Sequence, residues 1–280
     1  MEHYRRDDLI FDVRDAGPPD GPVVVLLHGF PQHHDSWDAV IDRLTAQGYR
    51  CLAPNQRGYS AGARPPRRRD YRIPELVADL GALIDASGAR QVHLVGHDWG
   101  AAVAWAAAAE MPERLATVSP ISVPHPAAFL KSFINSRQGL ASWYMFAFQL
   151  PRVPEWSMLR RGGTLLVKSL RQAGQTPAAA ERDAQAMREP GALRAAINWY
   201  RAMPLSNPRA ISQKVSVPTL YVWSDQDVAL LPKSAHNTAR YVTGEYRFEI
   251  LPGVSHWIPD EQPDKLVDLL LEWFAAHPAH

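Results

Sequence analysis

The feature that most constrains the fold of this chain is a regular alternation between short apolar runs and stretches with helical periodicity. Six short runs are typical of buried strands: Val23–Leu27, Cys51–Pro54, Val92–Val95, Thr117–Ile121, Thr219–Trp223 and Tyr246–Leu251. Between them, apolar residues recur every three or four positions in Ile73–Ala86, Gly100–Ala109 and Asp264–Ala275. Because such helices connect parallel strands, the alternation predicts an α/β fold with a mostly parallel, doubly wound sheet.

The alternation is interrupted once, and the interruption divides the chain into three segments. Residues 124–208 are rich in Trp, Arg, Met and Ala at helical spacing and contain no convincing strand pattern. We therefore predict a core made of residues 1–123 and 209–280, with residues 124–208 inserted as a helical cap. A chain of 280 residues is long enough for one such domain with a sizeable core.

Composition limits the partners and the compartment. The formal net charge is +1, which gives no reason to expect nucleic acid or an anionic membrane as a partner. The one charge run, Arg64–Asp70, contains two prolines and is typical of a solvated loop. Cys51 is the only cysteine, so an intramolecular disulfide is excluded. No segment resembles a signal peptide or a membrane span, and we expect a cytoplasmic protein.

The pentapeptide Gly96-His97-Asp98-Trp99-Gly100 has the spacing of a nucleophile elbow, a tight turn between a strand and a helix that presents a catalytic side chain. Gly96 and Gly100 flank Asp98 where larger side chains would collide. A carboxylate attacks saturated carbon and forms an alkyl ester, so Asp98 predicts the opening of an electrophilic C–O or C–X bond. The alternative is that Asp98 only caps the following helix, which leaves the paired glycines unexplained.

Hydrolysis of such an ester requires donors for the oxyanion that forms, and backbone N–H groups are the usual source. The N–H of Trp99 lies at the start of the predicted helix, and the loop His28-Gly29-Phe30-Pro31 can supply the N–H of Phe30. Gly29 allows close backbone approach, and Pro31 stiffens the turn and is compatible with a cis peptide bond. Taken alone, this loop could equally be a simple turn at the end of a strand.

His256 is the predicted base that activates water for hydrolysis of the ester. In the chain order nucleophile, acid, histidine, the base follows the last strand, and His256 lies there. Its orienting acid is expected in the loop after Thr219–Trp223, where Asp225 and Asp227 are both available. Asp227 is favoured because apolar residues follow it, whereas Asp225 suits the turn itself.

Together these motifs resemble the α/β-hydrolase superfamily and, within it, the epoxide hydrolases that use an aspartate nucleophile. The resemblance covers nearly the whole chain and includes Arg57-Gly58-Tyr59. It implies an α/β-hydrolase fold with an inserted helical cap, and two cap tyrosines that donate hydrogen bonds to the epoxide oxygen. Trp143–Gln149 and Asn198–Arg201 match the two tyrosine segments, which carries those roles to Tyr144 and Tyr200. Phenolic donors also suit the chemistry, because they stabilise the alkoxide as the C–O bond breaks. The alternative for each tyrosine alone is a packing role in the cap.

The substrate pocket is expected to be apolar and to favour lipophilic or aromatic molecules. The residues assigned to it are His28, Pro31, Trp99, Trp199 and Trp257, with Trp143 near the same centre. Three positions depart from the pattern of the family: Asn55 and Ser60 in a neighbouring loop, and Met145 beside Tyr144 in the pocket wall.

The predicted function is hydrolysis of a lipophilic epoxide to a vicinal diol through a covalent ester on Asp98, with no cofactor and no metal. A haloalkane or haloacid dehalogenase shares the nucleophile and is the first alternative, but the Asn and Arg typical of those enzymes are replaced here by Phe30 and Trp99. A ligand-binding protein without turnover is the second alternative. The expected partners are the epoxide and water, and a homodimer is compatible with the sequence.

Overall fold

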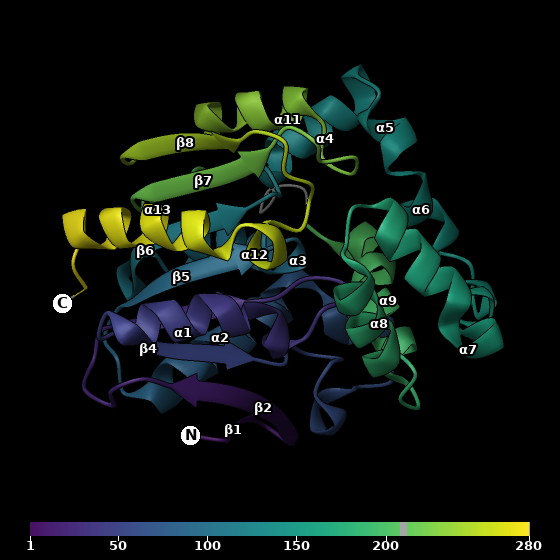
Figure 1. Ribbon diagram of the computed structural model, residues 1–280, viewed down its shortest axis with the longest axis horizontal. Helices are drawn as coiled ribbons and strands as arrows, with labels where there is room; N and C mark the ends of the chain where they lie inside the picture. The colour runs from purple at the N-terminus through teal and green to yellow at the C-terminus, as the bar shows by residue number, and fades with distance from the viewer. Residues whose placement is uncertain (208–211, 280) are drawn as a thin grey trace.

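A central sheet organises the described part of the chain, which comprises residues 1–207 and 212–279 of the computed structural model. Its eight strands follow the order β1-β2-β4-β3-β5-β6-β7-β8 (Figure 1). They are β1 (His3–Arg6), β2 (Leu9–Ala16), β3 (Val23–Leu27), β4 (Arg50–Pro54), β5 (Val92–His97), β6 (Leu115–Ile121), β7 (Thr219–Ser224) and β8 (Tyr246–Leu251). Pairings from β4 to β8 are parallel, and β1–β2 and β2–β4 are antiparallel. The prediction of an α/β fold with a mostly parallel sheet is confirmed.

All six predicted strands are present, with boundaries within two residues of the prediction. The largest differences are at β5, which continues to His97, and at β6, which begins at Leu115. All five residues of β3 are buried, as expected for a central strand that is covered on both faces.

The N-terminal hairpin of β1 and β2 is not predicted by the sequence. Its residues are mostly only partly buried, and charged residues interrupt the apolar pattern. Ion pairs with distant residues contribute to its attachment, because Arg6 lies 3.0 Å from Asp79 and Asp15 lies 2.7 Å from Arg50. A local sequence pattern cannot reveal such long-range pairs.

Helices cover both faces of the sheet. The helices outside the segment between β6 and β7 are α1 (Asp38–Ala46), α2 (Ile73–Ser87), α3 (Trp99–Glu110), α11 (Pro232–Asn237), α12 (Ile258–Glu261) and α13 (Pro263–Ala276). Val25 and Leu27 of β3 share an apolar core with α2 and α3, whereas Val24 and Leu26 share another with α1 and α13. Alternate residues of one strand therefore enter cores on opposite faces, as in a doubly wound sheet.

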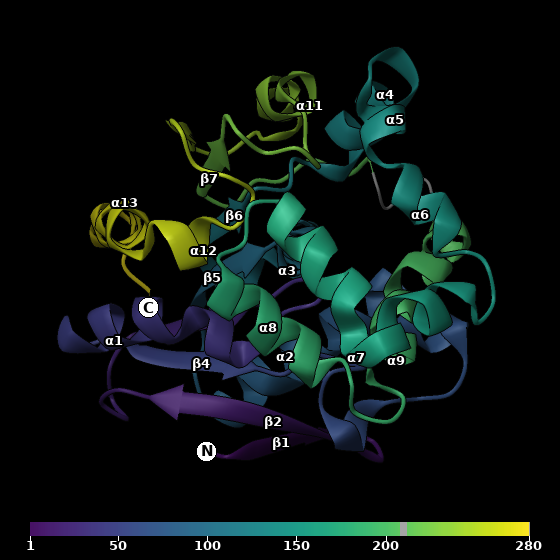
Figure 2. The same cartoon turned by 45° about the vertical axis from the view of Figure 1, so that its right-hand side comes forward.

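A run of helices connects β6 to β7. Among the described residues of this stretch they are α4 (Pro126–Asn135), α5 (Gln138–Ala141), α6 (Trp143–Ala147), α7 (Val153–Gln172), α8 (Pro177–Ala186) and α9 (Ala192–Ala202). Helix α7 contains a kink at Arg160–Gly163, where the backbone leaves the helical conformation. In Figures 1 and 2, α6 to α9 lie together at one side of the sheet. The predicted boundary at 208/209 lies outside the described residues.

Short 3₁₀ helices complete the described secondary structure. They span His34–Trp37, Ala61–Ala63, Arg68–Tyr71, Pro112–Arg114, Met203–Leu205 and Thr238–Tyr241. Within residues 1–207 and 212–279, no helix combines the length and apolar character needed to cross a bilayer.

Candidate active site

Asp98 occupies a sharp turn between β5 and α3. Its backbone has φ +51° and ψ −119°, a conformation that residues with side chains rarely adopt. A Cβ at Gly96 would overlap the backbone of Gly100, and a Cβ at Gly100 would overlap the backbone of Leu27. The glycines are therefore required by the close packing of this turn. The Asp98 side chain makes no capping hydrogen bond to α3, so capping does not account for an aspartate at this position.

The loop after β3 reaches the Asp98 carboxylate with a backbone donor. The N–H of Phe30 donates to Asp98 Oδ1 at 2.8 Å. Trp99 is the first residue of α3, where a backbone N–H has no carbonyl partner within the helix. The Phe30–Pro31 peptide bond is cis. One carboxylate oxygen thus has a donor of the kind that an oxyanion requires.

His256 lies between two carboxylates. Its Nδ1 is 2.7 Å from Asp227 Oδ2, and its Nε2 is 3.5 Å from Asp98 Oδ2. Both the histidine ring and the Asp227 carboxylate are almost entirely buried. The sheet topology therefore brings together three side chains that are far apart in the sequence.

The two aspartates of the loop after β7 have different surroundings. The second oxygen of Asp227, Oδ1, accepts hydrogen bonds from the backbone N–H groups of Ala229 and Leu230 at 2.8 and 2.9 Å. Asp225 is exposed, and its carboxylate accepts from the N–H of Gly253 at 2.7 Å. Only Asp227 contacts the histidine, whereas Asp225 connects two turns.

Electrostatics favour an ion pair between Asp98 and His256. Burial lowers the pKa of His256, but the charges and hydrogen bonds of Asp227 and Asp98 outweigh it and raise that pKa to about 10. Burial raises the pKa of Asp98, but the hydrogen bond and charge of His256 outweigh it and leave that pKa below its usual value. At neutral pH, a protonated imidazole therefore bridges two carboxylates.

Tyr144 on α6 and Tyr200 on α9 lie side by side near Asp98. Their ring centroids are 6.0 Å apart with an interplanar angle of 78°. The Tyr200 ring also meets the rings of Trp99 and Phe30 edge to face, at 5.0 and 5.4 Å. Burial and the charge of Asp98 raise the pKa of both tyrosines, so both hydroxyls remain protonated and able to donate.

The tryptophans predicted near the pocket differ in their surroundings, since two contact residues of the site and one is exposed. The Trp199 ring meets the Trp99 ring edge to face at 5.6 Å, and its Nε1 donates to the carbonyl of Arg57 at 2.8 Å. The Trp257 ring lies 5.1 Å from the His256 ring. Trp143 is 67% exposed, so the expectation that it lies near the centre of the site does not hold.

His28 and Pro31, which were also assigned to the pocket, are both buried. Both ring nitrogens of His28 have backbone partners, since Nδ1 lies 3.1 Å from the carbonyl of Gly29 and Nε2 accepts from the N–H of Gln56 at 3.1 Å. These contacts hold the loop that carries Phe30 and leave no ring nitrogen of His28 for a ligand.

Three residues that sequence reasoning missed hold the histidine loop in place. The carbonyl of His256 lies 2.9 Å from His97 Nε2 and accepts from Ser122 Oγ at 2.9 Å. The other ring nitrogen of His97 lies 3.0 Å from Gln32 Oε1. His97 is inside the pentapeptide of Asp98, which was the available signal, but nothing local indicated its partners.

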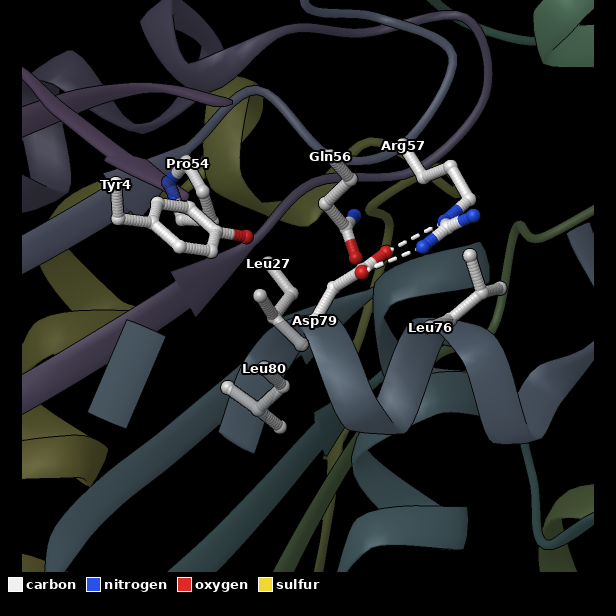
Figure 3. A pocket seen from close by; sticks show the side chains of 8 residues that line it. All are labelled: Tyr4, Leu27, Pro54, Gln56, Arg57, Leu76, Asp79 and Leu80. Atoms are coloured by element: carbon white, nitrogen blue, oxygen red, sulfur yellow. Dashed lines mark hydrogen bonds and ion pairs between the residues drawn. The ribbon is translucent and has the colours of Figure 1, made fainter. Parts of the chain in front are cut away.

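A small cavity beside the loop that follows β4 is lined by a buried ion pair. Arg57 binds Asp79 through two hydrogen bonds of 2.7 Å, and both side chains are almost fully buried (Figure 3). Tyr4, Leu27 and Gln56 are among the other lining residues. Asp98 is not among the residues that line this cavity. The ion pair fixes the loop that contains Arg57, and the backbone carbonyl of Arg57 accepts the hydrogen bond from Trp199 Nε1. Among the described residues, no cluster of His, Cys, Asp and Glu is arranged to hold a metal ion.

A comparison with protein families defines the class of this chain. The family model described as alpha/beta hydrolase fold matches residues 22–263. This range includes the turn of Asp98, the loop of Asp227 and His256, and all helices between β6 and β7.

Individual relatives narrow the class. The chain is 36% identical over 271 residues to AB hydrolase superfamily protein YfhM of Bacillus subtilis, covering 95% of this chain and 94% of that protein. It is 32% identical over 302 aligned positions to Epoxide hydrolase A of Mycobacterium tuberculosis, covering 93% and 92%. The crystal structure of Epoxide Hydrolase A from Mycobacterium thermoresistibile superposes with a TM-score of 0.85 at 25% identity, covering 99% and 98%. The chain therefore belongs to the alpha/beta hydrolase family, in its epoxide hydrolase group, and is a hydrolase.

Proposed function

We propose that this chain converts a lipophilic epoxide and water into a vicinal diol through a covalent ester on Asp98. The observation that carries the proposal is the tyrosine pair. The rings of Tyr144 and Tyr200 lie 6.0 Å apart, and the Tyr200 ring contacts the ring of Phe30, whose N–H donates to Asp98. Two protonated phenols beside a nucleophilic carboxylate suit a leaving oxygen that stays attached to the substrate. The name of the Mycobacterium tuberculosis relative, Epoxide hydrolase A, supports the same substrate class.

In the first step, Asp98 Oδ2 attacks an epoxide carbon. We assign the attack to Oδ2 because Oδ1 already accepts the Phe30 N–H. A bond forms between Oδ2 and that carbon, the C–O bond of the epoxide breaks, and the departing oxygen takes a proton from Tyr144 or Tyr200. The product is a hydroxyalkyl ester of Asp98 and a tyrosinate.

Ester formation also changes the state of His256. The ester carries no charge, so one of the two carboxylates that raise the pKa of His256 is lost. The imidazolium then releases its proton, directly or through water, to the tyrosinate. The proton required at the epoxide oxygen is thus supplied by the histidine, which becomes neutral when a base is needed.

In the second step, neutral His256 takes a proton from water and the water oxygen attacks Asp98 Cγ. Negative charge develops on Oδ1, where the N–H of Phe30 already lies and that of Trp99 is available. The bond from Cγ to Oδ2 then breaks, and the diol leaves with Oδ2 and a proton from His256. The remaining carboxylic acid loses its proton to His256, which restores the ion pair with Asp98.

A single-turnover reaction in ¹⁸O-labelled water tests this sequence of bonds. With enzyme in excess over styrene oxide, we expect the heavy isotope in an Asp98 peptide and none in the diol. Label in the diol would contradict a covalent ester. A parallel assay of halide release from chloroalkanes tests the dehalogenase alternative, with Asp98→Ala as the inactive control for both reactions.

We also propose that residues 124–208 act as a cap that supplies the two tyrosines to a core formed by 1–123 and 209–280. The aromatic contacts of Tyr200 on α9 with Phe30 and Trp99 of the core support this division. A cytoplasmic location and a homodimer remain predictions.

A further inference from the structure

The helices α4 to α7 expose an unusual number of large apolar side chains. Of the twelve such side chains exposed among the described residues, eight lie between Leu130 and Trp156. They are Leu130, Ile134, Leu140, Trp143, Phe146, Leu150, Val153 and Trp156, and we call them the apolar patch. Ile134 and Leu140 are 75% and 77% exposed, and both tryptophans exceed 60%. Exposed apolar residues gathered in one segment mark an interaction surface more often than isolated ones do.

The same segment is strongly basic. Residues 131–171 contain seven Lys and Arg and one acidic residue, Glu155, although the whole chain has a formal net charge of only +1. The basic residues are Lys131, Arg137, Arg152, Arg160, Arg161, Lys168 and Arg171, and all seven are exposed. Within the described residues, Glu155 is paired with Arg201 at 2.6 Å and none of the seven forms an ion pair. The small net charge of the chain therefore hides a segment with seven exposed positive charges and one paired negative charge.

Two of the basic side chains lie beside side chains of the apolar patch. Lys131 precedes Ile134 by three residues on α4, a spacing that places two side chains on one face of a helix. Arg160 lies at the kink of α7, four residues after Trp156. The Arg160 guanidinium lies 4.3 Å from the centre of the Trp156 ring, which shows this proximity directly. At these two places, positive charge therefore lies beside side chains of the apolar patch.

We propose that the apolar patch and the seven bases form a docking surface for an anionic phospholipid membrane. Tryptophan, phenylalanine and leucine insert at the level of the headgroups, while lysine and arginine bind the lipid phosphates. A second copy of the chain is a poorer occupant, because self-association through this surface would bring two sets of seven bases together. Helix α6 carries Trp143 and Phe146 of the apolar patch on either side of Tyr144, so docking brings the proposed site close to lipid-dissolved molecules.

Flotation with vesicles tests the docking surface, using phosphatidylcholine with and without phosphatidylglycerol as the probe. We expect binding only to vesicles with phosphatidylglycerol, and loss of binding at high salt. Each base near an anionic surface contributes about 1 kcal/mol, so Lys131→Gln with Arg137→Gln weakens partitioning roughly 30-fold. The matched control, Lys265→Gln with Arg90→Gln, removes exposed bases elsewhere and leaves binding within about twofold.

A second pair of variants tests the apolar part of the surface. Ile134→Ser reduces vesicle binding, whereas Ile250→Ser, at an exposed position on β8, does not. Circular dichroism of each variant shows whether it is folded. The proposal is overturned if no vesicles bind, if neutral vesicles bind equally well, or if the control variants have the same effect. It is also overturned if sedimentation shows a dimer that Ile134→Ser dissociates while vesicle binding is absent, since the surface would then belong to a second copy.

Discussion

Replacing Asp227 by Asn tests the assignment of the orienting acid most directly. At the 2.7 Å separation from His256 Nδ1, Coulomb's law gives about 6 kcal/mol for the charge interaction at an effective dielectric constant of about 20. An amide keeps part of this through its dipole, and breaking a buried pair typically costs about 3–5 kcal/mol. Taking about 4 kcal/mol, hydrolysis of the ester slows roughly a thousandfold, because each ~1.4 kcal/mol is a factor of ten.

The amide also changes the tautomer of the histidine. The N–H groups of Ala229 and Leu230 hold the acceptor oxygen at position 227, so the amide nitrogen faces His256 Nδ1. The ring then carries its proton on Nε2 and cannot accept one from water. Ester formation is affected less, and the ester accumulates.

Rapid quenching followed by intact-protein mass spectrometry measures both steps for Asp227→Asn, with Asp225→Asn as the matched control. We expect a persistent adduct with the mass of the substrate in the first variant and turnover within about twofold of wild type in the second, because its carboxylate is exposed. Equal loss of activity in the two variants, or a larger loss in Asp225→Asn, would refute the reasoning.

Three further predictions concern the same groups. His256→Gln forms the ester at a measurable rate but does not clear it, and mass spectrometry detects the adduct; a variant that turns over normally would contradict the role of a base. Tyr144→Phe and Tyr200→Phe each lower the rate of ester formation by about 10²-fold, and the double variant loses more than either; an unimpaired double variant excludes an epoxide as substrate. His256 has a folded-state pKa of about 10 against an ordinary value of 6.5, so its contribution to stability is complete below pH 6.5 and disappears as pH rises through 10. The difference in melting temperature between wild type and His256→Gln should shrink over that range, and a constant difference would contradict the ion pair.

The sequence predicted those parts of the fold and site that depend on local patterns. Strand β3 is a continuous apolar run and β8 alternates apolar with charged residues, and both patterns are visible in the sequence. The turn of Asp98 needs glycines that are visible at fixed spacing. The choice of Asp227 over Asp225 agrees with its contact to His256. The reason given for that choice holds only in part, because Leu230 is buried whereas Val228, directly after Asp227, is 58% exposed.

Features that depend on distant residues were not predictable in this way. The hairpin of β1 and β2 relies in part on pairs such as Arg6 with Asp79, which are 73 residues apart. The contacts of His97 with the His256 carbonyl join residues 159 positions apart. Trp143 illustrates the opposite error, because its sequence neighbour Tyr144 is near the site while its own side chain lies on the surface. Adjacent residues on a helix point in different directions, so proximity in sequence does not imply a shared environment.

The hydrogen bond from Phe30 to only one oxygen of Asp98 makes the two halves of a symmetric group chemically distinct. In the proposed mechanism, each cycle transfers Oδ2 of Asp98 to the diol and replaces it with an oxygen from water in the same position. If the carboxylate does not rotate, the oxygen that entered from water in one cycle is the oxygen that attacks the substrate in the next. In heavy-oxygen water, the second diol from each enzyme molecule would then carry the isotope completely, whereas a freely rotating side chain would deliver it only half of the time.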